Sequence, residues 1–189
     1  MLVNGVDWRA YVLLRELLDS PGLRLTYLEG ALEIMTPSRR HERVKKTLAR
    51  LLEVFALERD VPLLGYGSTT FRREAGERGL EPDECYTLGR VMLEEGPPDF
   101  ALEVVLTQPL LDKLTIYAGL RVREVWAWAD GTFRLFALRG EGGEAHYEEI
   151  GSSELVPGLE FLLLAEYADR EQQHDAVREY RDRLRVSGS

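Results

Sequence analysis

An acidic residue and a lysine stand where the sequence otherwise predicts buried structure. Glu103 interrupts the apolar run Phe100–Val105, and Lys113 lies among the apolar residues of the next segment, which has helical spacing. At about 100° per residue, Lys113 points between Tyr117 and Leu120, toward the inward side of that helix. Because burying a charge is costly, a carboxylate and an ammonium at such positions require a partner or a task.

A second acid, Asp83, follows Pro82 near the beginning of another predicted strand. Two carboxylates on neighbouring strands can share one divalent cation, since Mg²⁺ takes oxygen ligands and keeps several of its waters. Such an ion orients a water, lowers its pKa and neutralises charge that builds on a phosphoryl oxygen. Asp83, Glu103 and Lys113 are therefore the set that phosphodiester hydrolysis needs. Without metal, repulsion should raise the pKa of one carboxylate.

Two other interpretations use the same residues. Buried acids and lysines also pair structurally, so a Glu103–Lys113 ion pair would explain both positions. A glycosidase with two catalytic carboxylates is a third class, but it leaves Lys113 without a task and few aromatic residues line the motifs. Asp99 is assigned to a strand end or loop cap, because it lies roughly 13 Å from Glu103 at about 3.3 Å per residue. Glu33 falls on a polar strand face and is expected to be solvated.

A strand–helix–strand unit positions the acid and the lysine. The strands around Glu103 and over 122–129 are apolar on two faces, as in a sheet covered on each side. We expect 61–130 to form one sheet, with Asp83 and Glu103 on adjacent strands. The elements predicted before this unit are a helix over 7–19, a hairpin of 24–28 and 31–35, a helix from a Thr36 cap and Pro37 to about Arg59, and short strands within 61–72 and 81–88.

The elements predicted after residue 130 are a second hairpin, a segment that closes the core, and a charged helix. They cover 132–138 with 145–150, 155–162, and about 169–186. The chain of 189 residues suits one domain, 1–189, with a core over about 36–130.

Basic residues crowd the first half of the helix that follows Pro37, where cations oppose the helix dipole. They are a candidate contact for a phosphate backbone, and the alternative is a solvated helix face. His41 lies on the inward stripe, either as a satisfied core histidine, which we favour, or near a substrate phosphate. The candidate nucleic-acid-binding residues are Arg39, Arg40, His41, Arg43, Lys45 and Lys46.

Composition limits the classes of function. The net charge of −9 argues against indiscriminate nucleic-acid binding, so a local basic patch would be needed. No apolar run approaches the roughly 20 residues of a membrane span, and the N-terminus lacks the pattern of a signal peptide. Cys85 is the only cysteine, which excludes an intrachain disulfide and favours a cytoplasmic location.

Several segments together carry a family resemblance. They are Pro82-Asp83, Pro98-Asp99-Phe-Ala-Leu-Glu103-Val-Val, Asp112-Lys113-Leu-Thr-Ile-Tyr117-Ala, Val122-Arg-Glu-Val-Trp126, and Tyr27-Leu-Glu-Gly-Ala-Leu-Glu-Ile-Met-Thr-Pro-Ser38 followed by His41. This combination resembles a bacterial family of restriction-endonuclease-like proteins, the Uma-two-type family of the PD-(D/E)XK nuclease superfamily. The resemblance covers most of the chain, from about residue 8 to 167.

The resemblance implies an α/β (α+β) fold with a restriction-endonuclease-like core: a mixed β-sheet flanked by helices, with added N-terminal and C-terminal β-hairpins. It implies Asp83 and Glu103 as ligands of Mg²⁺, with Mn²⁺ as the alternative ion. The superfamily lysine normally lies two residues after the second acid, at Val105 here. In this family it is moved to the next helix, which matches Lys113. One departure is the link Leu106-Thr-Gln-Pro109, which replaces a longer serine-containing segment.

We therefore expect a Mg²⁺-dependent endonuclease that hydrolyses phosphodiester bonds of DNA, with DNA favoured over RNA. The alternative is a nuclease-like fold without catalysis that binds nucleic acid or a protein partner. We expect a homodimer, because cutting two strands calls for two sites and two-fold symmetry is the commonest assembly. An exposed Trp8 region or the C-terminal helix are the expected contacts, and no membrane association is expected.

Overall fold

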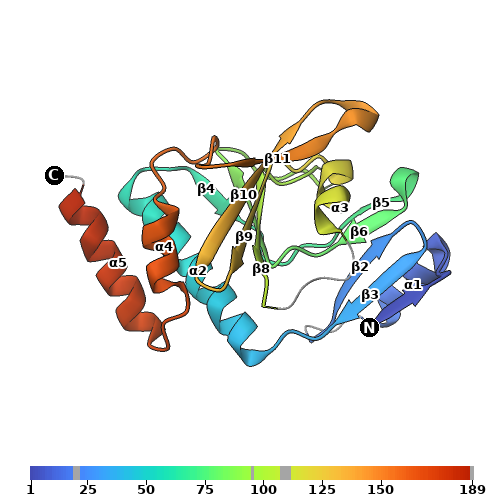
Figure 1. Cartoon of the computed structure of the whole chain (residues 1–189), viewed down its shortest axis with the longest axis horizontal. Helices are drawn as coiled ribbons and strands as arrows, with labels where there is room; N and C mark the ends of the chain where they lie inside the picture. The colour runs from blue at the N-terminus through green and yellow to red at the C-terminus, as the bar shows by residue number, and fades with distance from the viewer. Residues whose placement is uncertain (19–21, 95, 107–111, 188–189) are drawn as a thin grey trace.

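The computed structural model describes residues 1–18, 22–94, 96–106 and 112–187, which form two β-sheets and five α-helices (Figure 1). The larger sheet has six strands in the order β11-β10-β9-β8-β7-β4, and the smaller has five in the order β1-β3-β2-β6-β5. Within both sheets the pairs are antiparallel except β8 with β9, which is parallel. The predicted mixed α+β class is confirmed.

The bounds of the elements are as follows. The six-stranded sheet contains β4 (Leu63–Gly65), β7 (Glu84–Leu88), β8 (Phe100–Val104), β9 (Glu124–Ala129), β10 (Thr132–Arg139) and β11 (His146–Ile150). The five-stranded sheet contains β1 (Leu2–Asn4), β2 (Arg24–Leu28), β3 (Ala31–Met35), β5 (Phe71–Arg73) and β6 (Arg78–Leu80). The helices are α1 (Trp8–Leu17), α2 (Arg39–Glu58), α3 (Lys113–Leu120), α4 (Phe161–Ala168) and α5 (Gln173–Ser187).

The predicted strand–helix–strand unit is β8, α3 and β9. On one face of these strands, Phe100, Leu102 and Trp126 are buried in a core with α2, α4 and α5. On the other face, Ala101 and Val125 pack with α3. Figure 1 shows α2, α4 and α5 on one side of the six-stranded sheet and α3 with the five-stranded sheet on the other. Both faces are covered, which explains why the strands are apolar throughout.

Side chains alternate along β2 and β3, so the residues that pack on α1 lie on one face of the five-stranded sheet and Thr26 and Glu33 lie on the other. The two strands meet at Glu29-Gly30, whose positive φ angles of 46° and 88° are those of a tight hairpin turn. One face packs on α1, where the rings of Tyr11 and Tyr27 stack with centroids 4.6 Å apart. The opposite face, which carries Glu33, points toward the six-stranded sheet.

Two predictions for the first half of the chain were wrong, namely the start of one helix and the assignment of strands to a single sheet. The helix expected from Thr36 and Pro37 begins at Arg39, because Ser38 is the cap and its hydroxyl accepts the backbone N–H of His41 at 3.1 Å. The expectation of one sheet over 61–130 is wrong as well, since β5 and β6 pair with β2 in the smaller sheet.

The C-terminal part of the chain belongs to the core. The helix α4 was not predicted, and the last helix was expected as a candidate subunit contact. In the structure α5 buries Ala176, Tyr180 and Leu184 in the same core as α2. Trp8 is half-buried against the ring of Tyr11, with centroids 5.3 Å apart, so the expectation of an exposed Trp8 is wrong. None of the described helices is both long and apolar enough to cross a membrane.

If α5 is part of the core, Tyr180→Ala should lower the free energy of unfolding by about 3–5 kcal/mol, as for other buried aromatic residues. Val186→Ala on the same helix is the control, because Val186 is 80% exposed and its loss should change stability by at most about 0.5 kcal/mol. Urea unfolding of both variants measures the difference. Equal, small losses would show that α5 is dispensable to the fold.

Candidate active site

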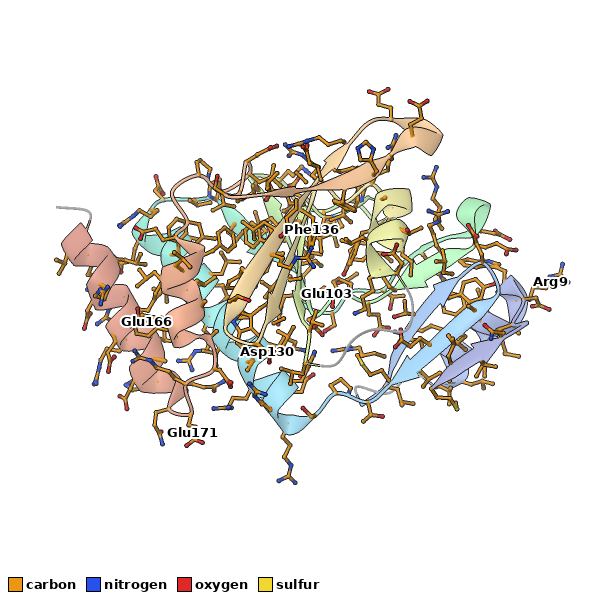
Figure 2. All side chains as sticks on the ribbon, in the orientation of Figure 1. Arg9, Glu103, Asp130, Phe136, Glu166 and Glu171 are labelled. Atoms are coloured by element: carbon orange, nitrogen blue, oxygen red, sulfur yellow. The ribbon has the colours of Figure 1, made fainter. Side chains whose placement is uncertain are left out.

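Of the two predicted acids, Glu103 lies in β8 and Asp83 lies just before the neighbouring strand β7. Glu103 is in β8 on the face that points to α3, and only 3% of the residue is exposed. Figure 2 labels Glu103 near the middle of the molecule. Asp83 directly precedes β7, which pairs with β8, and it is 4% exposed. Its Oδ2 accepts the backbone N–H of Val104 at 2.8 Å, so the Asp83 carboxylate lies beside the Glu103 backbone.

Lys113 reaches Glu103 from the first turn of α3. Asp112 caps this helix by accepting the backbone N–H of Leu114 at 3.0 Å, and Lys113 is its first residue. Nζ of Lys113 donates to Oε2 of Glu103 at 2.8 Å. The shortened link falls mostly on 107–111, outside the described residues, but the inward direction of Lys113 is confirmed. Burial lowers the pKa of Lys113, and the charges of Glu103 and Asp83 outweigh it, so the pKa lies above its ordinary value.

Tyr117 holds the other oxygen of Glu103. It lies one turn after Lys113 on the same face of α3, is fully buried, and donates its hydroxyl to Oε1. Burial raises the pKa of Glu103. The positive charge of Lys113 lowers this pKa and the negative charge of Asp83 raises it, and the net pKa lies above its ordinary value. The expected raised pKa is therefore confirmed at Glu103, although burial rather than repulsion is its main cause.

His41 belongs to the same site. Its Nε2 lies 3.0 Å from Oδ2 of Asp83, and Nδ1 lies 3.4 Å from Oε1 of Glu42. Burial alone would lower the pKa of His41. The hydrogen bond with Asp83 and the charge of Asp83 outweigh burial, so the pKa of His41 lies above its ordinary value. Burial raises the pKa of Asp83, but the hydrogen bond from His41 and the charge of Lys113 bring it below its ordinary value. The favoured interpretation of His41 as a core histidine is correct about its burial, but the contact with Asp83 was not predicted.

Contacts from the smaller sheet fix the backbone before Asp83. Glu81 is buried and forms ion pairs with Arg15 of α1 and with Arg24 of β2, the latter at 3.1 Å. Arg24 also donates to Oγ of Ser68 at 2.9 Å, and Ser68 donates to the carbonyl of Asp83 at 3.2 Å. Because these partners come from distant segments, the position of Asp83 depends on how the two sheets meet.

A cavity of about 130 Å³ opens onto Glu103, Lys113 and His41. Glu33 lines it beside the Glu103–Lys113 pair and is only 7% exposed, so the prediction of a solvated Glu33 is wrong. The alternation of its strand was predicted correctly, but the polar face is covered by the other half of the molecule. The described lining residues are Thr26, Glu33, Met35, Thr36, Pro37, Ser38, His41, Glu103, Val104, Val105, Leu106 and Lys113.

The basic cluster of α2 is partly neutralised. Arg40 and Arg43 form ion pairs with Asp169, which follows α4, at 2.6 and 2.7 Å. Lys45 pairs with Glu42 at 3.1 Å. The two remaining cations, Arg39 and Lys46, are exposed and have no carboxylate partner among the described residues. The cluster therefore attaches α2 to the end of α4, and its nucleic-acid role stays a prediction.

Asp99 caps a loop, as predicted from its distance to Glu103. It accepts the backbone N–H of Leu88 at 2.9 Å and pairs with Arg90 at 3.1 Å and Arg123 at 3.3 Å. No role was predicted for Tyr117, although its spacing of four residues from Lys113 places both on one helix face.

The donor set fits a hard divalent cation. The described part of the chain contains no group of three or more His, Cys, Asp or Glu side chains arranged to hold a metal ion. Mg²⁺ does not need such a group, since one or two carboxylates, waters and substrate phosphates complete its shell. Asp83 and Glu103 would supply those carboxylates, and the contacts of Asp83 with His41 and Val104 both use Oδ2.

Two buried carboxylates and a lysine therefore lie together where a mixed sheet meets a helix. The chain belongs to the Uma2 family, described as putative restriction endonucleases, whose model matches residues 8–168. A solved structure described as a putative nuclease belonging to DUF820, from Anabaena variabilis, is similar at 14% identity. It aligns over 89% of this chain and 98% of that chain, with a TM-score of 0.44. No curated protein matches the chain.

The His41–Asp83 contact predicts a stability change with pH. Because the pKa of His41 is raised in the folded state, its stabilisation is complete below the unfolded pKa of about 6.5 and is lost as the pH rises through the folded pKa. Each pKa unit of separation is worth about 1.4 kcal/mol. Urea unfolding between pH 6 and 9 should show this decline in the wild type and not in His41→Gln.

The control is His174→Gln, which changes an exposed histidine of α5 and should keep the decline. The Asp83 contribution lies outside this window: its lowered pKa gives stability that is lost only as the pH falls through the folded value. An unchanged decline in His41→Gln would contradict the assignment.

Proposed function

We propose that this chain is a Mg²⁺-dependent endonuclease that hydrolyses phosphodiester bonds of DNA. The observation that supports it most is the second buried acid beside the Glu103–Lys113 pair. A structural ion pair needs one carboxylate and one ammonium, and a further buried carboxylate adds a desolvation cost. Asp83 bears that cost, and its contacts with His41 and with the backbone of Val104 both use Oδ2.

Each residue then has a role that follows from its contacts. Asp83 and Glu103 would hold Mg²⁺, which when bound lowers the pKa of a water and neutralises phosphoryl charge. Lys113 places a positive charge at the cavity, where it can stabilise negative charge on a phosphate oxygen. Tyr117 and His41 are positioning residues, because they orient the Glu103 and Asp83 carboxylates.

The rival function is a nuclease-like fold that binds nucleic acid or protein without cutting. One observation favours it: Lys113 and Tyr117 already occupy both oxygens of Glu103, as a structural ion pair would. The two functions differ in what happens when metal is added, so metal-dependent stability distinguishes them.

Adding Mg²⁺ at a hundredfold excess over Kd should stabilise the wild type by about 2.7 kcal/mol. Asp83→Asn should abolish that gain, because it removes a charged ligand. Lys113→Met should keep the gain but lower cleavage of duplex DNA by about 10²–10³-fold, by analogy with single donors to an anion. Thermal melts with and without Mg²⁺, and a cleavage assay, measure these effects.

Asp99→Asn is the matched control, since Asp99 directly precedes β8 and is as buried as Asp83, but it caps a loop. It should lower stability and leave the Mg²⁺ response intact. A purely structural ion pair predicts a different pattern. Lys113→Met would then cost about 3–5 kcal/mol by stranding Glu103, and the wild type would not respond to metal. That outcome would sink the nuclease proposal.

Duplex cleavage calls for two sites, and a two-fold homodimer would supply them. Trp8 and the buried face of α5 pack inside the subunit, so the dimer contact would lie on other surfaces.

The cytoplasmic location and the choice of DNA over RNA stay predictions.

Among the candidate nucleic-acid-binding residues, Arg39 and Lys46 are the exposed cations left to contact DNA. Arg39→Ala and Lys46→Ala should each weaken DNA binding on all sequences alike and reduce the slope of log K against log salt by about 1. Filter binding from 50 to 200 mM salt measures the slope. Arg183→Ala is the control, because this exposed arginine lies near Arg185, which pairs with Glu58 at the opposite end of α2. Equal slopes in all variants would mean that α2 does not contact the backbone.

A further inference from the structure

A second pocket, of about 690 Å³, lies beside α3. Three arginines line it: Arg73 of β5, Arg78 of β6, and Arg121, which directly follows α3. Figure 1 shows α3 between the strands β5 and β6 and the loop end of β10 and β11, and the loop glycines 142–143 line the same pocket. This arginine pocket gathers three positive charges in a chain whose net charge is −9.

The register of the smaller sheet brings two of these charges together. Arg73 lies directly opposite Arg78 across β5 and β6, and like charges at opposed positions destabilise a strand pair. Arg73 donates to the carbonyl of Gly119 at 3.0 Å. Arg78 donates to the carbonyl of Thr115 at 3.3 Å. These carbonyls of α3 hold the two guanidinium groups without neutralising their charge.

Carboxylates leave most of this charge uncompensated. Among the described lining residues Asp112 is the only carboxylate, and it is engaged as the cap of α3. Glu29 lies 3.6 Å from Arg78, but the Glu29 side chain is 68% exposed, so the pair is weak. Neither Arg73 nor Arg121 forms an ion pair with a carboxylate within the described part of the chain. The basic cluster of α2, by contrast, is largely paired with acids.

A glycine makes room for the guanidinium of Arg78. A Cβ atom at Gly119 would overlap Nη1 of Arg78, so any other residue at this position of α3 would displace the guanidinium. Arg78 is therefore held in place before any ligand binds. A planar guanidinium ordered in this way loses little conformational entropy on binding an anion, and it can donate two parallel hydrogen bonds to one phosphate.

We propose that the arginine pocket binds a backbone phosphate of the nucleic acid that the active site cleaves. This inference rests on the proposed function and adds an anion site to it. The pocket adjoins the catalytic cavity at the start of α3, because Asp112 lines the pocket and Lys113 lines the cavity. The eight residues of α3 span about 12 Å, which is the axial rise of about three to four base pairs. A strand bound at Lys113 therefore presents a further phosphate at the arginine pocket.

The test is the salt dependence of binding to a short DNA duplex, measured by fluorescence anisotropy in buffer with EDTA, where no metal-dependent cleavage occurs. Arg121→Gly should weaken binding by about three- to tenfold at 100 mM salt and reduce the slope of log K against log salt by about 1. Because Arg121 has a φ of 67°, glycine is favoured at this position, and unfolding would not explain a loss of binding.

Two further variants control for charge. Arg121→Lys keeps the positive charge and should keep the slope. Arg183→Ala removes an exposed arginine from α5 and should bind as the wild type does, which separates a local contact from an effect of net charge.

Equal slopes in the wild type and Arg121→Gly would overturn this inference and leave the proposed function standing. The same result with inorganic phosphate bound at the pocket would make it a site for free anions instead, and would also overturn the inference. Thermal melts with Mg²⁺ test the proposed function separately. A wild type with neither a Mg²⁺ response nor DNA cleavage would refute that function, and this inference with it.

Discussion

The burial of one carboxylate is the constraint on which the rest of the structure depends. Glu103 loses its hydration in the middle of β8, and it is stabilised only if donors reach both oxygens. Lys113 and Tyr117 supply those donors from one face of α3, so this helix must pack on β8 at a single position along the strand. The same requirement explains why an amphipathic lysine can sit within an apolar stripe.

The second acid extends this constraint to the rest of the fold. Asp83 is held by His41 at the start of α2 and by the backbone of β8, while the segment before it is held by Arg24 of the smaller sheet. The site therefore forms where two sheets and two helices meet. Its shape depends on packing between parts of the chain that are far apart in sequence.

The features that depend on local periodicity could be predicted. The strand–helix–strand unit, the inward direction of Lys113 and the capping role of Asp99 all follow from spacing within one element or along one strand. The features that depend on distant pairing could not. Strand alternation shows which face carries Glu33 but not what covers that face. Likewise, the contact of His41 with Asp83 and that of Arg40 with Asp169 join segments 42 and 129 residues apart.

Anomalous diffraction from a crystal soaked with Mn²⁺ would test whether the buried acids Asp83 and Glu103 form a metal site. If they do, the map should show one strong peak bound by carboxylate oxygens of both Asp83 and Glu103. A map without a peak at these carboxylates, and with the Lys113–Glu103 pair intact at saturating Mn²⁺, would contradict the metal site.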